Sequence, residues 1–219
     1  MKDYEIFANY CKTNLDLENT ITVNPDYKSL TLCIIDCIYS LRAKYIQVTL
    51  PIVKRYADKY LNGDMHASDT LEDFMNNVNQ YESYDSFAEE VLKNMQFSGP
   101  YRKSRICYEV ARKLRLLGIN TFSDFRNYPS TEILEIVLKS VKGVGDAALN
   151  YLFMLAGDQN RCKPDVHIKH CVRDALGYDL NSDQDYVDLF RNAVNYLASD
   201  YPKLTARKLD NIIWTKYST

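Results

Sequence analysis

Residues 131–157 have the sequence TEILEIVLKSVKGVGDAALNYLFMLAG. In the first part, apolar side chains recur three and four positions apart, which is typical of one face of an α-helix. The turn Val141–Gly145 then carries two glycines, and glycine permits a tight turn. A small residue, Ala147, begins a second apolar stretch, which stops at Gly157. The sequence therefore predicts two short helices joined by a tight hairpin at about 131–156.

This hairpin has the chemistry of a phosphate-binding turn. Without Cβ atoms, its glycines let the backbone approach a ligand closely. Backbone N–H groups of the turn and of the following helix N-terminus point outward, and such groups bind phosphate oxygens without reading base sequence. We expect contacts to DNA phosphates from Lys142, Gly143, Val144 and Gly145.

Outward from the hairpin, helical periodicity dominates the chain. Only 7 Gly and 6 Pro interrupt it, which favours long helices over many short strands. An all-α fold without strands is therefore predicted. Further helices are expected at about 24–43 (beginning at Asn24-Pro25), 48–61, 70–78, 85–95, 102–117, 165–177, 182–198 and 203–215.

Composition limits the class of protein. Hydrophobic residues make up 46% of the 219, which indicates an ordered globular chain. The first ten residues lack the order of a signal peptide, and the most apolar stretch, 30–41, is too short to span a bilayer. We expect a soluble intracellular protein without a membrane partner. The six cysteines show no disulfide or C-x-x-C pattern, so buried free thiols are expected.

Charge is segregated along the chain. The formal net charge of −2 argues mildly against nucleic-acid binding. Residues 58–90 hold nine acids and one Lys, whereas residues 99–115 hold six bases and one acid. Such segregation can steer a polyanion to one face of a protein, although an ordinary solvated helix surface also explains it.

A second segment gives the hairpin its context. The segment Lys163-Pro164-Asp165-Val166-His167-Ile168 opens a new helix, and its Asp165 lies twenty residues after Gly145. Together, residues 133–174 resemble the signature of the helix-hairpin-helix (HhH-GPD) DNA glycosylase superfamily, which includes endonuclease III and the 8-oxoguanine glycosylases. The resemblance implies that Asp165 is the catalytic carboxylate, although Asp at a helix start is also a common N-cap.

Two shorter segments extend the resemblance. Ser40-Leu41-Arg42-Ala43 is similar to the family segment that inserts a polar side chain where a base has flipped out, with Arg42 at the inserting position. The segment from Gly99 to Lys103 resembles the loop before a barrel helix, which implies DNA contacts for Arg102 and Lys103. The implied architecture is two helical lobes around a cleft, one formed by residues 28–158 and the other by 1–27 with 159–219.

The resemblance also implies a reaction. A base inside a duplex must flip out before its glycosidic bond can be reached, and a carboxylate then stabilises the positive charge that develops on the sugar. The lyase members' nucleophilic Lys is replaced by Ala147, so hydrolysis without strand cleavage is expected. No cysteine follows Cys171, so no iron–sulfur cluster or other cofactor is expected beyond a possible monovalent cation at the hairpin.

The resemblance thus implies a DNA glycosylase of base excision repair, whose partner is double-stranded DNA with a flipped lesion base. Asp146 lies where a phosphate would approach the helix start, and with Ala147 it keeps a second function open, a non-catalytic helix-hairpin-helix DNA-binding protein. A helical protein–protein adaptor is a third possibility. The carboxylate of Asp165 favours the enzyme, because a mere clamp on the backbone has no need of it.

Overall fold

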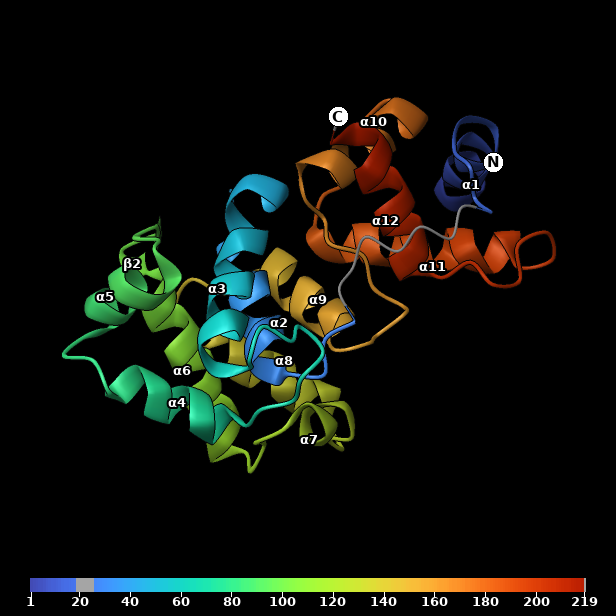
Figure 1. Cartoon of the computed structure of the whole chain (residues 1–219). Coiled ribbons are helices and arrows are strands. Elements are labelled where there is room, and N and C mark those ends of the chain that lie inside the picture. The colour runs from blue at the N-terminus through green and yellow to red at the C-terminus, as the bar shows by residue number, and fades with distance from the viewer. Residues whose placement is uncertain (19–25, 219) are drawn as a thin grey trace. The chain divides into compact units, whose positions relative to one another are not determined.

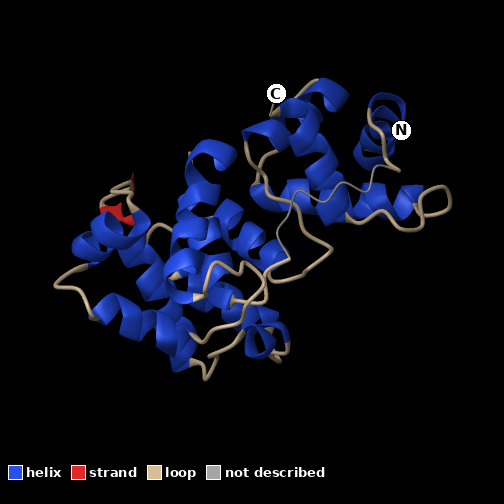
Figure 2. Cartoon of the chain, in the orientation of Figure 1, coloured by secondary structure: helices blue, strands red, loops and turns tan. Residues whose placement is uncertain are grey.

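A computed structural model describes residues 1–18 and 26–218 of the chain. The described residues are mostly helical, which confirms the predicted all-α class (Figure 2). The expected helix start at Asn24-Pro25 lies outside them. The α-helices are α1 (Asp3–Asn14), α2 (Leu30–Tyr39), α3 (Leu50–Tyr60), α4 (Leu71–Asn79), α5 (Tyr84–Phe87), α6 (Lys103–Leu116), α7 (Phe122–Arg126), α8 (Thr131–Lys139), α9 (Asp146–Leu155), α10 (Val166–Leu176), α11 (Asp183–Leu197) and α12 (Ala206–Tyr217). Two π-helical segments are η1 (Tyr45–Thr49) and η2 (Ala88–Leu92).

The expectation of no strand is wrong at one place. Strands β1 (Phe97–Ser98) and β2 (Tyr101–Arg102) form a short antiparallel hairpin, drawn in red in Figure 2. Gly99 has a φ of 60° between them, a left-handed conformation that suits glycine in a tight turn. Two residues per strand are too few for an alternating pattern to be visible in the sequence.

The chain divides into two compact units. One unit is formed by residues Asp26–Ala156, and α2 is the central helix of this unit. All ten residues of α2 are buried, as its apolar surface all round predicts. It packs against α3, α4, α6 and α9 (Figure 1). Helices α8 and α9 contact each other, and α8 also contacts α6, so the predicted hairpin lies on α6.

The other unit combines Met1–Pro25 with Gly157–Thr219. Helix α1 packs against α10 and α11, and α12 packs against the same two helices. Phe7 of α1 and Phe190 of α11 meet with ring centroids 5.1 Å apart in this core. Each of the two hydrophobic cores is formed by residues of one unit alone.

All six cysteines are buried, as expected, and none of them forms a disulfide. No helix in the described part of the chain is both long and apolar enough to cross a membrane.

Candidate functional site

The hairpin between α8 and α9 is a close-fitting turn on α6. The amide of Val144 donates to the carbonyl of Val141 over 3.0 Å, and both side chains are buried. Gly143 has a φ of 101°, and a Cβ there would lie 2.6 Å from Cδ1 of Ile106 on α6. Glycine at 143 is therefore required both by the backbone conformation and by the close approach to α6.

Gly145 has a different environment. It is the N-cap of α9 with a φ of −98°, and a Cβ added to it would meet nothing within 4 Å. The space beside it is therefore open. Gly145 has no side chain that could cap the first backbone amides of α9. In α8, by contrast, the Oγ of Ser130 accepts the backbone amide of Ile133. Uncapped N–H groups at a helix N-terminus favour a bound anion.

Asp146, at the start of α9, forms an ion pair with Lys139 at the end of α8 over 2.5 Å. Both side chains are about half exposed, so the pair adds little to stability. Its effect is electrostatic, because the negative charge beside the turn is offset by a neighbouring ammonium group.

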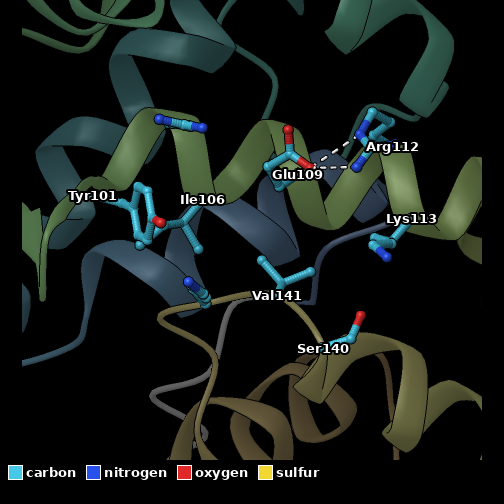
Figure 3. Close-up of a pocket in the computed structure, with 9 residues that line it drawn as sticks. Tyr101, Ile106, Glu109, Arg112, Lys113, Ser140 and Val141 are labelled. Carbon is cyan, nitrogen blue, oxygen red and sulfur yellow. Dashed lines mark hydrogen bonds and ion pairs between the residues drawn. The ribbon is translucent and has the colours of Figure 1, made fainter.

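A pocket of about 370 Å³ lies beside the hairpin. Helix α6 lines one side of it, and the end of α8 and the turn line the other (Figure 3). Its lining residues are Tyr101, Arg105, Ile106, Glu109, Arg112, Lys113, Ser140, Val141 and Lys142. Four of these nine side chains are basic and one is acidic, so the pocket has a net positive charge.

Most of that positive charge is unpaired. The guanidinium of Arg112 donates to Glu109 over 2.7 Å and 3.0 Å, which cancels one charge. Arg105 lies over the ring of Tyr101, with Cζ 4.9 Å from the ring centroid. Among the residues that the structure describes, no carboxylate forms an ion pair with Arg105, Lys113 or Lys142. These three cations can therefore meet an anionic ligand.

The two basic residues expected from the loop before α6 make contacts within the chain. Arg102 forms an ion pair with Asp85, donates to the Met95 carbonyl and lies over the ring of Phe97. Lys103 is only 2% exposed. Its ammonium group donates to the carbonyls of Tyr39 and Leu41 over 3.1 Å and 2.7 Å and to the side chain of Gln96 over 3.1 Å.

Lys103 therefore binds the carbonyl end of α2, where a positive charge also complements the helix dipole. Helix α2 ends at Tyr39 rather than near Ala43, and the chain turns at Arg42, which is exposed with a φ of 53°. A non-glycine residue in the left-handed region is uncommon and holds this segment in a distinct turn.

Asp165, in the other unit, is the N-cap of α10. Its Oδ1 accepts the amides of His167 over 2.9 Å and of Ile168 over 3.2 Å. The side chain is half-buried, and the helix dipole favours its negative charge. Ala147, which stands where the resemblance would place a nucleophilic lysine, lies in the first turn of α9 and presents no nucleophile.

A second carboxyl group, which the sequence did not predict, lies close to Asp165. Asp210 of α12 is 7% exposed, and its Oδ1 accepts the amide of Lys163 over 2.7 Å. Burial first, and then the charge of Asp165, raise the pKa of Asp210 to about 8. The only sequence signal was an acidic residue within the apolar periodicity of the last helix.

Another buried carboxylate, that of Asp36, accepts hydrogen bonds from several parts of the unit formed by residues 26–156. Asp36 lies in the middle of α2 with no exposed surface. The hydroxyls of Tyr27 and Tyr45 donate to its Oδ2 over 2.8 Å each, and that of Tyr151 on α9 donates to its Oδ1 over 3.0 Å. Burial, and then the charge of Asp36, raise the pKa of Tyr45 well above its usual value. An acid in an apolar helix signals that such partners are needed.

In the described part of the chain, no group of three or more His, Cys, Asp or Glu side chains is arranged to hold a metal ion. Comparison with curated proteins and with solved structures gives no match to this chain. A family model described as "Domain of unknown function (DUF8548)" matches residues 5–218. Because this match covers nearly the whole chain, the protein belongs to the DUF8548 family.

Proposed function

We propose that this protein is a DNA glycosylase that hydrolyses the bond between a damaged or mispaired base and its deoxyribose, without cleaving the strand. The observation that carries the proposal is the positively charged pocket beside the glycine hairpin. The proposal assigns backbone binding to the hairpin and the pocket, and chemistry to Asp165.

Support for backbone binding comes from charge and open space. Arg105, Lys113 and Lys142 supply three cations without an acidic partner in the described residues, and Gly145 leaves room beside the start of α9. Phosphate groups are bound by such cations together with backbone amides, without base recognition. Arg102 and Lys103 are left out of the proposed surface, because their side chains are engaged within the chain.

Support for chemistry comes from Asp165. A half-buried carboxylate fixed by two backbone amides is preorganised, so it stabilises a developing sugar cation without first having to reorganise. It can also orient the water that attacks the sugar. Without a lysine at 147, no amine at that position forms a Schiff base, so water is the nucleophile in this proposal.

The first experiment measures binding to duplex DNA over a range of salt concentrations. Affinity should fall steeply with salt, by about one power of the salt concentration for each phosphate contacted. Lys142→Ala, Arg105→Ala and Lys113→Ala should each weaken binding and reduce that slope. Arg191→Ala, which removes an exposed Arg from α11 that pairs with Asp188, is the matched control and should bind as wild type. Binding that does not depend on salt, or is absent at low salt, contradicts the proposal.

The second experiment tests reaction type. The protein is incubated with a panel of lesion-containing duplexes, and alkali then reveals abasic sites. Strand breaks should appear only after alkali. A borohydride-trapped covalent adduct would instead show that an amine acts as nucleophile and would overturn the hydrolytic assignment.

A non-catalytic DNA-binding protein is the second candidate, and one observation favours it. Oδ1 of Asp165 is engaged with two backbone amides, so a helix cap alone accounts for its position. This candidate predicts the same salt-dependent binding but no base release from any duplex of the panel.

A further inference from the structure

The segment that leads to Asp165 is held by three hydrogen bonds to α12 and its N-cap residue, Thr205. The backbone amide of Arg207 donates to the carbonyl of Gln159 over 3.2 Å, and the hydroxyl of Thr205 donates to the side chain of Gln159 over 3.2 Å. Four residues further along the segment, the amide of Lys163 donates to Asp210 over 2.7 Å. The last bond lies two residues before Asp165, so α12 sets where the segment enters α10.

We propose that Asp210 is a positioning residue, which holds Asp165 in its working position by accepting the amide of Lys163. This inference rests on the function proposed above. Asp210 is nearly inaccessible, so it acts on the reaction through the backbone and not by touching the DNA.

A carboxyl group at position 210 does more than an amide could at the same place. Accepting one N–H requires only an amide or carbonyl oxygen, whereas burying a carboxylate is costly. A carboxylic acid differs from an amide in that it can lose its proton. The titratable groups around Asp210 are Asp165, the buried thiol of Cys162, Lys163 and Arg207. Asp165 favours the protonated form of Asp210, and Lys163 and Arg207 oppose it less strongly than burial and Asp165 favour it. Burial raises the pKa of the Cys162 thiol.

The balance between burial and these neighbouring groups sets the pH range in which Asp210 ionises. With a pKa of about 8, Asp210 is mostly protonated at neutral pH and ionises as the pH rises through 8. A second negative charge then develops next to Asp165, and like charges in a poorly solvated place repel. The amide of Lys163 binds the ionised carboxyl group more strongly, but the repulsion should displace the side chain of Asp165 in alkaline solution, and the rate of base release should fall there.

The first test follows base release between pH 6 and pH 9.5 in four proteins. The wild-type rate should fall above pH 8, whereas Asp210→Asn, which accepts the same N–H and cannot ionise, should not show this fall. Asp210→Ala should be at least tenfold slower than wild type at every pH. Asp188→Asn removes a half-exposed carboxylate from α11 and should behave as wild type. An Asp210→Ala variant with the wild-type rate, or an Asp210→Asn variant with the same alkaline fall, would overturn the inference.

A second test does not depend on activity. Carboxyl carbon NMR should show Asp210 titrating near pH 8 in the wild type and at lower pH in Asp165→Asn, where the neighbouring charge is gone. Amide exchange of Lys163 should be slower in Asp210→Asn than in Asp210→Ala. If Asp210 titrates near its ordinary value of about 4, the inference is wrong even when the enzyme is active. If both readouts hold but no duplex loses a base, only the proposed function fails.

Discussion

At the scale of single residues, Asp165 has two separable roles, because one carboxylate both caps a helix and carries a negative charge. Its Oδ1 already accepts two backbone amides. Asparagine caps a helix about as well as aspartate but has no charge. A substitution of this one residue therefore distinguishes a structural role from a catalytic role.

Asp165→Asn should fold and bind DNA at least as tightly as wild type, because the change removes a negative charge from a protein for which we propose a polyanionic ligand. Base release should slow by a factor of about 100 or more, since a preorganised electrostatic group has been lost. The measurements are thermal unfolding, DNA affinity and single-turnover base release. A folded variant that excises bases at the wild-type rate would leave Asp165 as a cap only.

The two hairpin glycines make a matched pair of variants. Gly143→Ala should lower the free energy of unfolding by about 1–3 kcal/mol, because its φ of 101° is unfavourable for alanine and the new Cβ meets Ile106. Gly145→Ala should change stability by less than about 0.5 kcal/mol, because its φ is negative and the space is open. Urea denaturation measures both. Equal effects of the two changes would show that the hairpin does not lie on α6 as described.

Some of the site could be predicted from the sequence and some could not. The hairpin, its glycines and the capping position of Asp165 depend on residues close together in the chain, where local rules apply. The burial of Lys103 and the neighbourhood of Asp210 and Asp165 depend on residues far apart in the chain. The resemblance of residues 99–103 to the family loop implied a DNA contact for Lys103, and lysine is rarely buried, so no local feature of the sequence indicates that this side chain is buried.

At the scale of elements, the helices that could be predicted have local start and stop signals. The first helix of the hairpin was expected to begin at about 131, and α8 spans Thr131–Lys139, with Ser130 as its N-cap. Helix α7 was missed because five residues give too little periodicity. An ordinary α-helix was expected at 48–61, but the chain first forms the π-helical segment η1 at Tyr45–Thr49. A change of helix type has no simple signal in the sequence.

The contact between α6 and the end of α2 gives a prediction about stability. Lys103→Met should lower the free energy of unfolding by about 2–4 kcal/mol, because it leaves three buried or half-buried acceptors without their donor. Its DNA affinity, measured where the variant is folded, should keep the wild-type dependence on salt.

Lys142→Met is the matched control, because Lys142 is exposed and pairs with no acid in the described residues. Its stability should stay within about 0.5 kcal/mol of wild type, while its DNA binding becomes weaker and less dependent on salt. If instead Lys103→Met weakens binding without loss of stability, Lys103 reaches DNA and the described cap of α2 is incorrect.

At the scale of the whole molecule, each unit has a hydrophobic core of its own. The unit of residues 26–156 is continuous in the chain and contains the hairpin and the positively charged pocket. A segment with a complete core and continuous sequence meets the usual conditions for independent folding.

Residues 26–156 expressed alone should therefore be helical by circular dichroism and unfold cooperatively in urea. The fragment should bind duplex DNA with a steep dependence on salt and release no base, because Asp165 is absent from it. Gly143→Ala should destabilise the fragment as much as the full chain. A fragment that is unfolded at low temperature would show that its core is not sufficient.

The other unit is built from two separate parts of the chain, and this has a consequence during protein synthesis. Helix α1 is made before α10 and α11, against which it packs and which follow about 150 and 170 residues later. At roughly 5–20 residues per second, this delay is on the order of ten seconds. Until α11 is made, Phe7 lacks its ring contact with Phe190. The unit of residues 26–156 is made completely within this time, while α1 lacks the helices that cover its apolar face. A chain that is cut short after Ala156 and released would therefore combine a complete core with an uncovered first helix, which makes it a substrate for chaperones and proteases.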